Sequence, residues 1–176
     1  NEVDGDQIIA ILAKHMAQRD ELANNVVVTT IMCNLGFEKA MEREGISVIK
    51  TKVGDRYVLE QMQAMGANLG GEQSGHIIML DKNSTGDGLA TALALCAVIV
   101  ETRASLSELA QVMTKYPQVL VNVPVAHKHH LTASVAIAQA VSEAEAALGD
   151  SGRVLVRASG TEPLVRVMAE AADLGQ

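Results

Sequence analysis

Hydrophobic and polar positions divide the first two thirds of the chain into alternating helix-like and strand-like segments. Apolar residues at helical spacing predict four helices, at about 7–22, 35–44, 54–65 and 89–101. Asp6 is the expected N-cap of the first helix. β-branched residues predict two strands, at 25–31 and 46–51, the first of them buried. Alternating strands and helices of this kind predict a mixed or parallel sheet covered by helices, an α/β domain.

The pattern changes near Pro117. Before it, Ser105 and Glu108 resemble a capping box that opens a short helix to about Lys115. After it, the pattern predicts a strand, an alanine-rich helix and two further strands, at about 118–126, 131–148, 153–158 and 164–171. We therefore expect two domains, 1–116 and 117–176, with a candidate hinge at 114–118.

Composition and charge exclude several classes of partner. The net charge is −7 and only 2% of the residues are aromatic, which disfavours nucleic acid and anionic membrane surfaces. The longest apolar run, 89–100, is too short to span a bilayer. Cys33 and Cys96 form no CxxC pair, so we expect buried free thiols in a reducing compartment. The chain begins without Met inside a charged segment, and we expect it to be a piece of a longer protein.

The first chemically distinctive stretch is the glycine-rich segment 70–76, which lies between two short apolar segments. Its three glycines, Gly70, Gly71 and Gly75, allow a sharp turn that approaches a ligand closely. Glu72 can accept hydrogen bonds from two neighbouring sugar hydroxyls, and Ser74 can donate or accept. His76 can carry a proton near neutral pH. The residues alone leave two interpretations open, a ligand-binding loop or a hairpin turn with polar side chains.

The second stretch is the segment 157–163, whose features suit a phosphate group. Gly160 frees the backbone to form a concave nest of N–H groups, and Ser159 and Thr161 add hydroxyl donors. Arg157 can hold two phosphate oxygens in a fork, and Arg166 follows on the next predicted strand. An ordinary hairpin loop with surface arginines is the alternative.

Two further groups are weaker candidates. A basic strand-to-helix junction suits an anion but also fits a solvated loop, and it contains Lys50, Lys52 and Arg56. Asp55 beside it is interpreted as a helix cap. Three histidines follow the strand at 118–126, but no fourth ligand is obvious, so we predict an exposed turn and assign no metal site: His127, His129 and His130.

Taken together, the motifs resemble the α-D-phosphohexomutase superfamily. The supporting stretches are VDGDQI at 3–8, VGDRYV at 53–58, GGEQSGHIIM at 70–79, TGDGLATAL at 85–93 and VRASGTEPLVRVMAE at 156–170. They cover nearly the whole chain, and their order and spacing make the resemblance specific. GEQSGH with VGDRYV favours the glucosamine branch over phosphomannomutase-like relatives.

The resemblance implies a place within a larger enzyme. That family has four domains, and this chain matches the third, an α/β domain, and the fourth, a TATA-binding-protein-like α+β domain. The loop that carries the family's phosphorylated serine has no match here, nor has the loop that binds magnesium. The resemblance therefore implies that the chain supplies sugar and phosphate binding and is inactive alone, while Mg²⁺ is bound elsewhere in the full-length enzyme.

The implied reaction interconverts glucosamine 6-phosphate and glucosamine 1-phosphate through a bisphosphorylated sugar, for UDP-N-acetylglucosamine and peptidoglycan synthesis. By resemblance, Glu72, Ser74 and Gly75 hold sugar hydroxyls. The phosphate that does not react is held by Arg157, Ser159, Gly160, Thr161 and Arg166. His76 would assist proton transfer, and Arg56 would add positive charge near the reacting phosphate.

Further expectations come from the same resemblance. Glucosamine or glucose 1,6-bisphosphate is the expected activator, and the partners are a phosphorylated hexosamine and the N-terminal domains of the same enzyme. A homodimer in the cytoplasm is expected for the full-length protein. Alternatives are a stand-alone sugar-phosphate-binding module, a phosphomannomutase or phosphoglucomutase relative, and an assembly domain whose polar loops are incidental.

Overall fold

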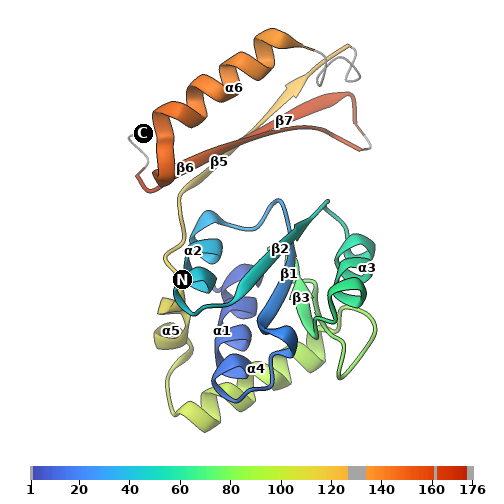
Figure 1. Cartoon of the computed structure of the whole chain (residues 1–176), viewed down its shortest axis with the longest axis vertical. Coiled ribbons are helices and arrows are strands. Elements are labelled where there is room, and N and C mark those ends of the chain that lie inside the picture. Colours follow the sequence, from blue (N-terminus) through green and yellow to red (C-terminus); the bar gives the residue numbers. More distant parts are fainter. Residues whose placement is uncertain (1, 127–133, 161, 174–176) are drawn as a thin grey trace. The chain divides into compact units, whose positions relative to one another are not determined.

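The computed structural model describes residues 2–126, 134–160 and 162–173. Contacts between Cα atoms divide the chain into two compact units, Asn1–Lys115 and Tyr116–Gln176. Each unit is described by itself below (Figure 1).

A four-stranded mixed sheet forms the centre of the first unit. Its strands are β1 (Val26–Thr30), β2 (Ser47–Thr51), β3 (Leu69–Gly71) and β4 (Ile77–Met79). The order is β2-β1-β3-β4, in which β1 pairs in parallel with both β2 and β3, and β4 pairs antiparallel with β3. The prediction of a mixed α/β sheet is therefore confirmed. β1 is buried along its whole length, as its run of β-branched residues predicts.

Helices cover both faces of this sheet (Figure 1). The helices of this unit are α1 (Gly5–Gln18), α2 (Leu35–Arg43), α3 (Asp55–Met65), α4 (Gly88–Thr102) and α5 (Leu106–Leu109), with 3₁₀ turns at Ala23–Asn25 and Ala110–Val112. Val27 of β1 points into the core formed with α1 and α2, which includes Phe37. Val28 points to the opposite core, formed with α3 around Met62. This alternation along β1 produces two separate hydrophobic clusters.

The first helix begins two residues earlier than predicted, at Gly5 instead of Gln7. Asp4 is the N-cap, and it forms a capping box with Gln7 in which each side chain bonds the other residue's backbone N–H. Asp6 lies inside the first turn and is fully buried. Its carboxylate accepts a hydrogen bond of 2.7 Å from the backbone N–H of Asn34, so it joins the start of α1 to the start of α2. The prediction of Asp6 as the cap was wrong.

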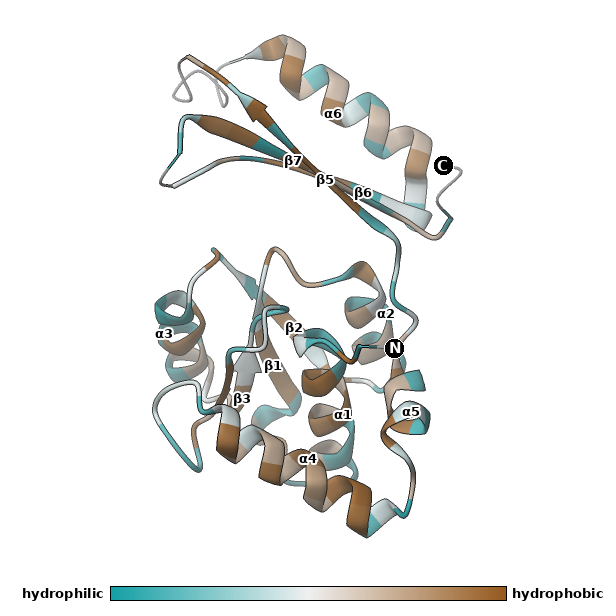
Figure 2. Cartoon of the chain, turned by 180° about the vertical axis from the view of Figure 1, so that it is seen from behind, coloured by the Kyte–Doolittle hydropathy of each residue, from teal (hydrophilic) through white to brown (hydrophobic). Residues whose placement is uncertain are grey.

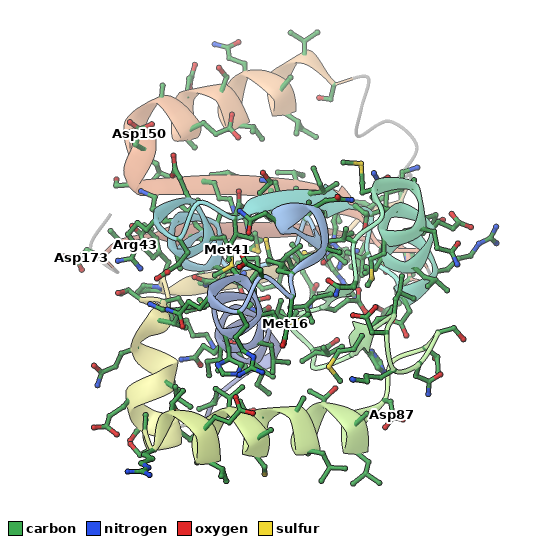
Figure 3. All side chains as sticks on the ribbon, turned by 60° about the horizontal axis from the view of Figure 1, so that its bottom comes forward. Met16, Met41, Arg43, Asp87, Asp150 and Asp173 are labelled. Atoms are coloured by element: carbon green, nitrogen blue, oxygen red, sulfur yellow. The ribbon has the colours of Figure 1, made fainter. Side chains whose placement is uncertain are left out.

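α4 carries an exposed apolar stripe. Asp87 caps its start by accepting a hydrogen bond from the backbone N–H of Ala90 (Figure 3). Further along, Leu89, Leu93 and Val100 are 73%, 63% and 75% exposed, and the ribbon of α4 is strongly hydrophobic (Figure 2). Cys96 is exposed on the same helix, whereas Cys33 is buried, so the expectation of two buried thiols is confirmed for one only.

Among the described residues, no single helix is both long and apolar enough to cross a bilayer. By length and composition alone, one bent pair qualifies, Gly88–Thr102 with Leu106–Val112, whose axes differ by 97°.

The second unit is a three-stranded antiparallel sheet with one long helix. Its elements are β5 (Gln118–Pro124), α6 (Val135–Leu148), a 3₁₀ turn (Gly149–Ser151), β6 (Gly152–Ala158) and β7 (Leu164–Ala171), and the strand order is β5-β7-β6. Valines of the sheet and apolar residues of α6 line an open groove of about 730 Å³. The smaller α+β architecture is as predicted. The three histidines at 127, 129 and 130 lie outside the described residues.

A buried ion pair crosses this second sheet. Glu170 of β7 is 1% exposed, and its carboxylate pairs with the Nε atom of Arg153 on the neighbouring strand β6. On the other side, Nε2 of Gln118 donates to the same carboxylate over 3.0 Å. The charge on Glu170 is thus compensated from both strands that flank β7.

Candidate functional site

The glycine-rich segment forms the tight hairpin between β3 and β4. The backbone N–H of Glu72 donates to the carbonyl of His76 over 2.9 Å, and that of Gly75 donates to the carbonyl of Glu72 over 3.0 Å. Gly75 has φ +98°, a conformation that L side chains rarely adopt. The turn therefore holds Glu72 and His76 at the two ends of one short loop.

The start of α1 packs directly beneath this hairpin. The backbone N–H of Gly5 donates to the carbonyl of Gln73 over 3.1 Å. A Cβ added at Gly5 would overlap the carbonyl oxygen of Glu72 and come within 2.7 Å of the carbonyl oxygen of Gln73 and of the backbone nitrogen of Gly75. Only glycine at position 5 allows the backbone of α1 to approach so closely, and this contact fixes the position of the hairpin relative to the start of α1.

Glu72 is the most enclosed polar residue of the hairpin, at 9% exposure. Its Oε1 atom accepts a 3.0 Å hydrogen bond from the backbone N–H of Gly54, the residue before α3. Its Oε2 atom lies 3.7 Å from Nδ1 of His76, and Oδ1 of Asp55 lies 3.6 Å from the same nitrogen. Burial first, and then the adjacent Asp55 carboxyl group, raise the pKa of Glu72 above its ordinary value.

The structure thus places Asp55 in a different environment from the one predicted from the sequence. Asp55 was expected to cap α3, but the N-cap is Gly54, and the Asp55 side chain joins Glu72 and His76 instead. The pairing of β3 with β4 and the start of α3 create this neighbourhood, and residues 17 positions apart in the sequence give no local signal of it.

The remaining sequence candidates near this loop are more exposed. Ser74 lies at the exposed tip of the hairpin, and the side chain of His76 is 64% exposed. Arg56 points into solvent from the first turn of α3, with 85% of its side chain exposed, and pairs with Glu60 over 2.7 Å. Lys50 pairs with Glu38 over 2.8 Å. The basic junction is therefore partly neutralised by nearby carboxylates.

The second candidate loop connects β6 to β7 in the other unit. Arg157 and Arg166 lie directly opposite each other in the antiparallel register, so the two guanidinium-bearing side chains lie on the same face of the sheet. Ser159 is 3% exposed, and its hydroxyl accepts a 3.2 Å hydrogen bond from the backbone N–H of Glu162. Gly160 is exposed in the loop, and Thr161 lies outside the described residues.

The charges of this loop favour an anion. Burial first, and then the positive charge of Arg166, lower the pKa of Arg157. The buried Nε atoms of both arginines have no hydrogen-bond partner among the described residues. Arg166 is paired at its Nη2 atom with Glu162 over 3.2 Å. Two like charges side by side with unsatisfied N–H donors are an arrangement that a bound phosphate would stabilise.

Comparison with known proteins places both units in one family. Residues 4–116 match the family described as phosphoglucomutase/phosphomannomutase, alpha/beta/alpha domain III. Residues 120–176 match the C-terminal domain of the same family. The chain belongs to the phosphoglucomutase/phosphomannomutase family.

Among curated proteins, phosphoglucosamine mutases are highly similar to the chain. The protein of Streptomyces coelicolor is 59% identical over 175 residues, that of Carboxydothermus hydrogenoformans 59% over 173, and that of Staphylococcus carnosus 56% over 172. These alignments cover 98–99% of this chain but only 38–39% of the length of each relative.

Solved structures show the same fold at low identity. Aspergillus fumigatus N-acetylphosphoglucosamine mutase in complex with GlcNAc-6P and magnesium matches with a TM-score of 0.81 at 22% identity, over 98% of this chain and 44% of that one. An N-acetylglucosamine-phosphate mutase in its substrate complex matches with a TM-score of 0.81 at 23% identity, over 98% and 41%. Both confirm the predicted fold class.

Proposed function

We propose that the chain forms the third and fourth domains of a phosphoglucosamine mutase, which interconverts glucosamine 6-phosphate and glucosamine 1-phosphate. The identity to curated phosphoglucosamine mutases, 56–59% over nearly the whole chain, supports this substrate choice. The observation that carries the proposal is the arginine pair of the β6–β7 loop, because buried guanidinium N–H groups without partners are chemically suited to a phosphate.

In this proposal the β3–β4 hairpin binds the sugar. The Glu72 carboxylate, held by the backbone N–H of Gly54, accepts hydrogen bonds from sugar hydroxyls, and Ser74 adds a donor at the loop tip. Gly75 allows the turn that presents them. His76 lies within reach of the Glu72 carboxylate and assists proton transfer, while Arg56 contributes positive charge near the reacting phosphate.

The β6–β7 loop binds the phosphate that does not react. Arg157 and Arg166 supply charge-assisted hydrogen bonds, and Ser159, Gly160 and Thr161 supply hydroxyl and backbone donors. Phosphoryl transfer depends mainly on positioning and charge neutralisation, so these contacts act by fixing the sugar phosphate rather than by reacting with it.

The remaining parts of the reaction belong to the full-length enzyme. We propose that its other domains supply the phosphorylated serine and hold Mg²⁺, and that a hexose 1,6-bisphosphate activates it. Cytoplasmic location and a homodimer follow the same proposal. The isolated 176-residue chain then shows no mutase turnover, even with glucose 1,6-bisphosphate and magnesium present.

The test is Arg157→Ala in the full-length enzyme. Losing one charge-assisted contact to phosphate costs about 1.5–3 kcal/mol, so kcat/KM for glucosamine 6-phosphate should fall about 10–150-fold. A coupled assay of glucosamine 1-phosphate formation measures it. Arg103→Ala, which removes an exposed arginine at the end of α4, is the control and should retain activity.

Unchanged kcat/KM in Arg157→Ala would show that the β6–β7 loop does not hold the phosphate. Mutase turnover by the isolated chain would contradict its assignment as the binding half of a larger enzyme.

A further inference from the structure

Three side chains around the β3–β4 hairpin approach one another closely, those of Asp55, Glu72 and His76. Nδ1 of His76 lies 3.6 Å from Oδ1 of Asp55 and 3.7 Å from Oε2 of Glu72, both longer than a hydrogen bond. One donor atom from each residue lies within 4.8 Å of the others. Two carboxyl groups and one imidazole thus gather in one place, and the imidazole nitrogen lies just outside hydrogen-bonding distance of either carboxyl group.

That spacing matches the distances between ligands around a small divalent metal ion. Zinc binds imidazole nitrogen and carboxylate oxygen at about 2.0–2.2 Å, which separates neighbouring ligands of a tetrahedral or trigonal site by about 3.3–3.8 Å. The nitrogen ligand favours zinc or cobalt over magnesium, which prefers an all-oxygen shell.

The surroundings of the three residues also favour a cation. The carboxyl groups of Asp55 and Glu72 lie close together, and a bound cation would offset the repulsion between their ionised forms. The backbone N–H of Gly54 holds the other oxygen of Glu72 over 3.0 Å, which orients the carboxylate before any ion binds. His76 and Asp55 are about half exposed or more, so an ion could enter from solvent with a water completing its shell.

We propose that Asp55, Glu72 and His76 form a binding site for a transition-metal dication of the zinc class, with water as a fourth ligand. The site is a property of these three side chains and does not depend on the proposed mutase activity. One consequence does rest on that proposal. Because the metal engages the carboxylate assigned to the sugar, zinc should inhibit the full-length enzyme in competition with the sugar phosphate.

Cobalt titration of the 176-residue chain tests the site. Of the four other histidines, three lie within four consecutive residues and could take metal together, so the starting protein carries alanine in their place, at positions 127, 129 and 130. We expect one equivalent of Co²⁺ to bind, with visible d–d absorption of a four- or five-coordinate ion, and Zn²⁺ to displace it. His76→Ala and Asp55→Asn should each weaken cobalt binding at least about tenfold.

Glu60→Gln is the matched control, since it removes an exposed carboxylate from the same helix as Asp55 and should leave cobalt binding unchanged. Far-UV circular dichroism of every variant checks that the chain is folded. The metal site is refuted if the starting protein binds no cobalt, or if folded His76→Ala binds it as tightly. Either result leaves the mutase proposal intact, because that proposal is tested at Arg157.

Discussion

At the scale of single residues, the environment of Glu72 predicts how the stability of the fold depends on pH. Its folded-state pKa is raised by burial and by Asp55, so the folded chain favours the protonated carboxyl group. The stability that this group contributes is fully present below its unfolded pKa and is lost as pH rises through the raised value. At neutral pH the ionised Glu72 therefore destabilises the fold relative to a neutral side chain of the same shape.

Glu72→Gln should accordingly be more stable than the parent chain at pH 7, since glutamine keeps an acceptor for the Gly54 N–H. The difference should shrink as pH falls toward the ordinary glutamate pKa of about 4.3. Urea unfolding from pH 4 to pH 8 measures it, and Glu60→Gln controls for the loss of one negative charge on the surface. A stability difference that stays constant with pH would contradict the raised pKa.

The ion pair of Arg153 with Glu170 gives a second prediction at this scale. Arg153→Met removes the partner of a carboxylate that is 1% exposed, and leaving a buried charge so poorly compensated costs about 3 kcal/mol of unfolding free energy. Urea unfolding checks the loss. The double variant Arg153→Met with Glu170→Met should regain most of it, because both charges are then gone. A double variant as unstable as the single one would show that the loss comes from packing.

At the scale of elements, the close contact of α1 with the β3–β4 hairpin links the stability of a helix to the position of a binding loop. Gly5→Ala places a methyl group against the carbonyls of Glu72 and Gln73, so either α1 or the hairpin must move. We expect a loss of about 1–3 kcal/mol in unfolding free energy and shifted amide resonances across 72–76.

Gly88→Ala is the matched control for this substitution. Gly88 is likewise the first residue of a helix, α4, but a Cβ there meets no atom within 4 Å. It should be neutral or stabilise by up to about 1 kcal/mol. Equal effects of the two substitutions would mean that the contact beneath the hairpin does not constrain the loop.

The sequence predicted most elements because their signals are local. The β-branched run of β1, the glycine that ends α3 and the Ser105–Glu108 capping box each lie within a few residues of the feature they specify. Predictions that depended on tertiary contacts did worse. Asp6 has the chemistry of a cap, but the burial of its carboxylate against Asn34 moves the cap to Asp4.

For the candidate site too, residues in local motifs could be predicted from the sequence, whereas contacts between distant segments could not. Glu72, His76 and the arginine-rich loop stood out through motifs within a few consecutive residues. The approach of Asp55 to Glu72 could not be predicted, because it depends on where the start of α3 lies relative to the hairpin. Arg157 and Arg166 share one face of the sheet because of the register between β6 and β7. A one-residue shift of that register would place the two side chains on opposite faces.

At the scale of the whole molecule, the division at Lys115 predicts two unfolding transitions. The first unit has two dense clusters around its sheet, whereas α6 and the sheet of the second unit leave an open groove between them. Amide hydrogen exchange in rising urea should therefore show β5–β7 losing protection before β1 and β3.

Arg153→Met tests directly whether the two units unfold independently. It should lower the urea midpoint of the second unit and leave that of the first unchanged. One coincident transition for all amides, shifted as a whole by the substitution, would show that the two units unfold cooperatively.

The apolar stripe of α4 has a practical use, because it carries the exposed Cys96 while Cys33 is buried. A maleimide dye should therefore attach at a single position of the folded chain without any mutagenesis. When these residues form part of a longer polypeptide, the labelling rate of Cys96 would report how far another domain shields that helix.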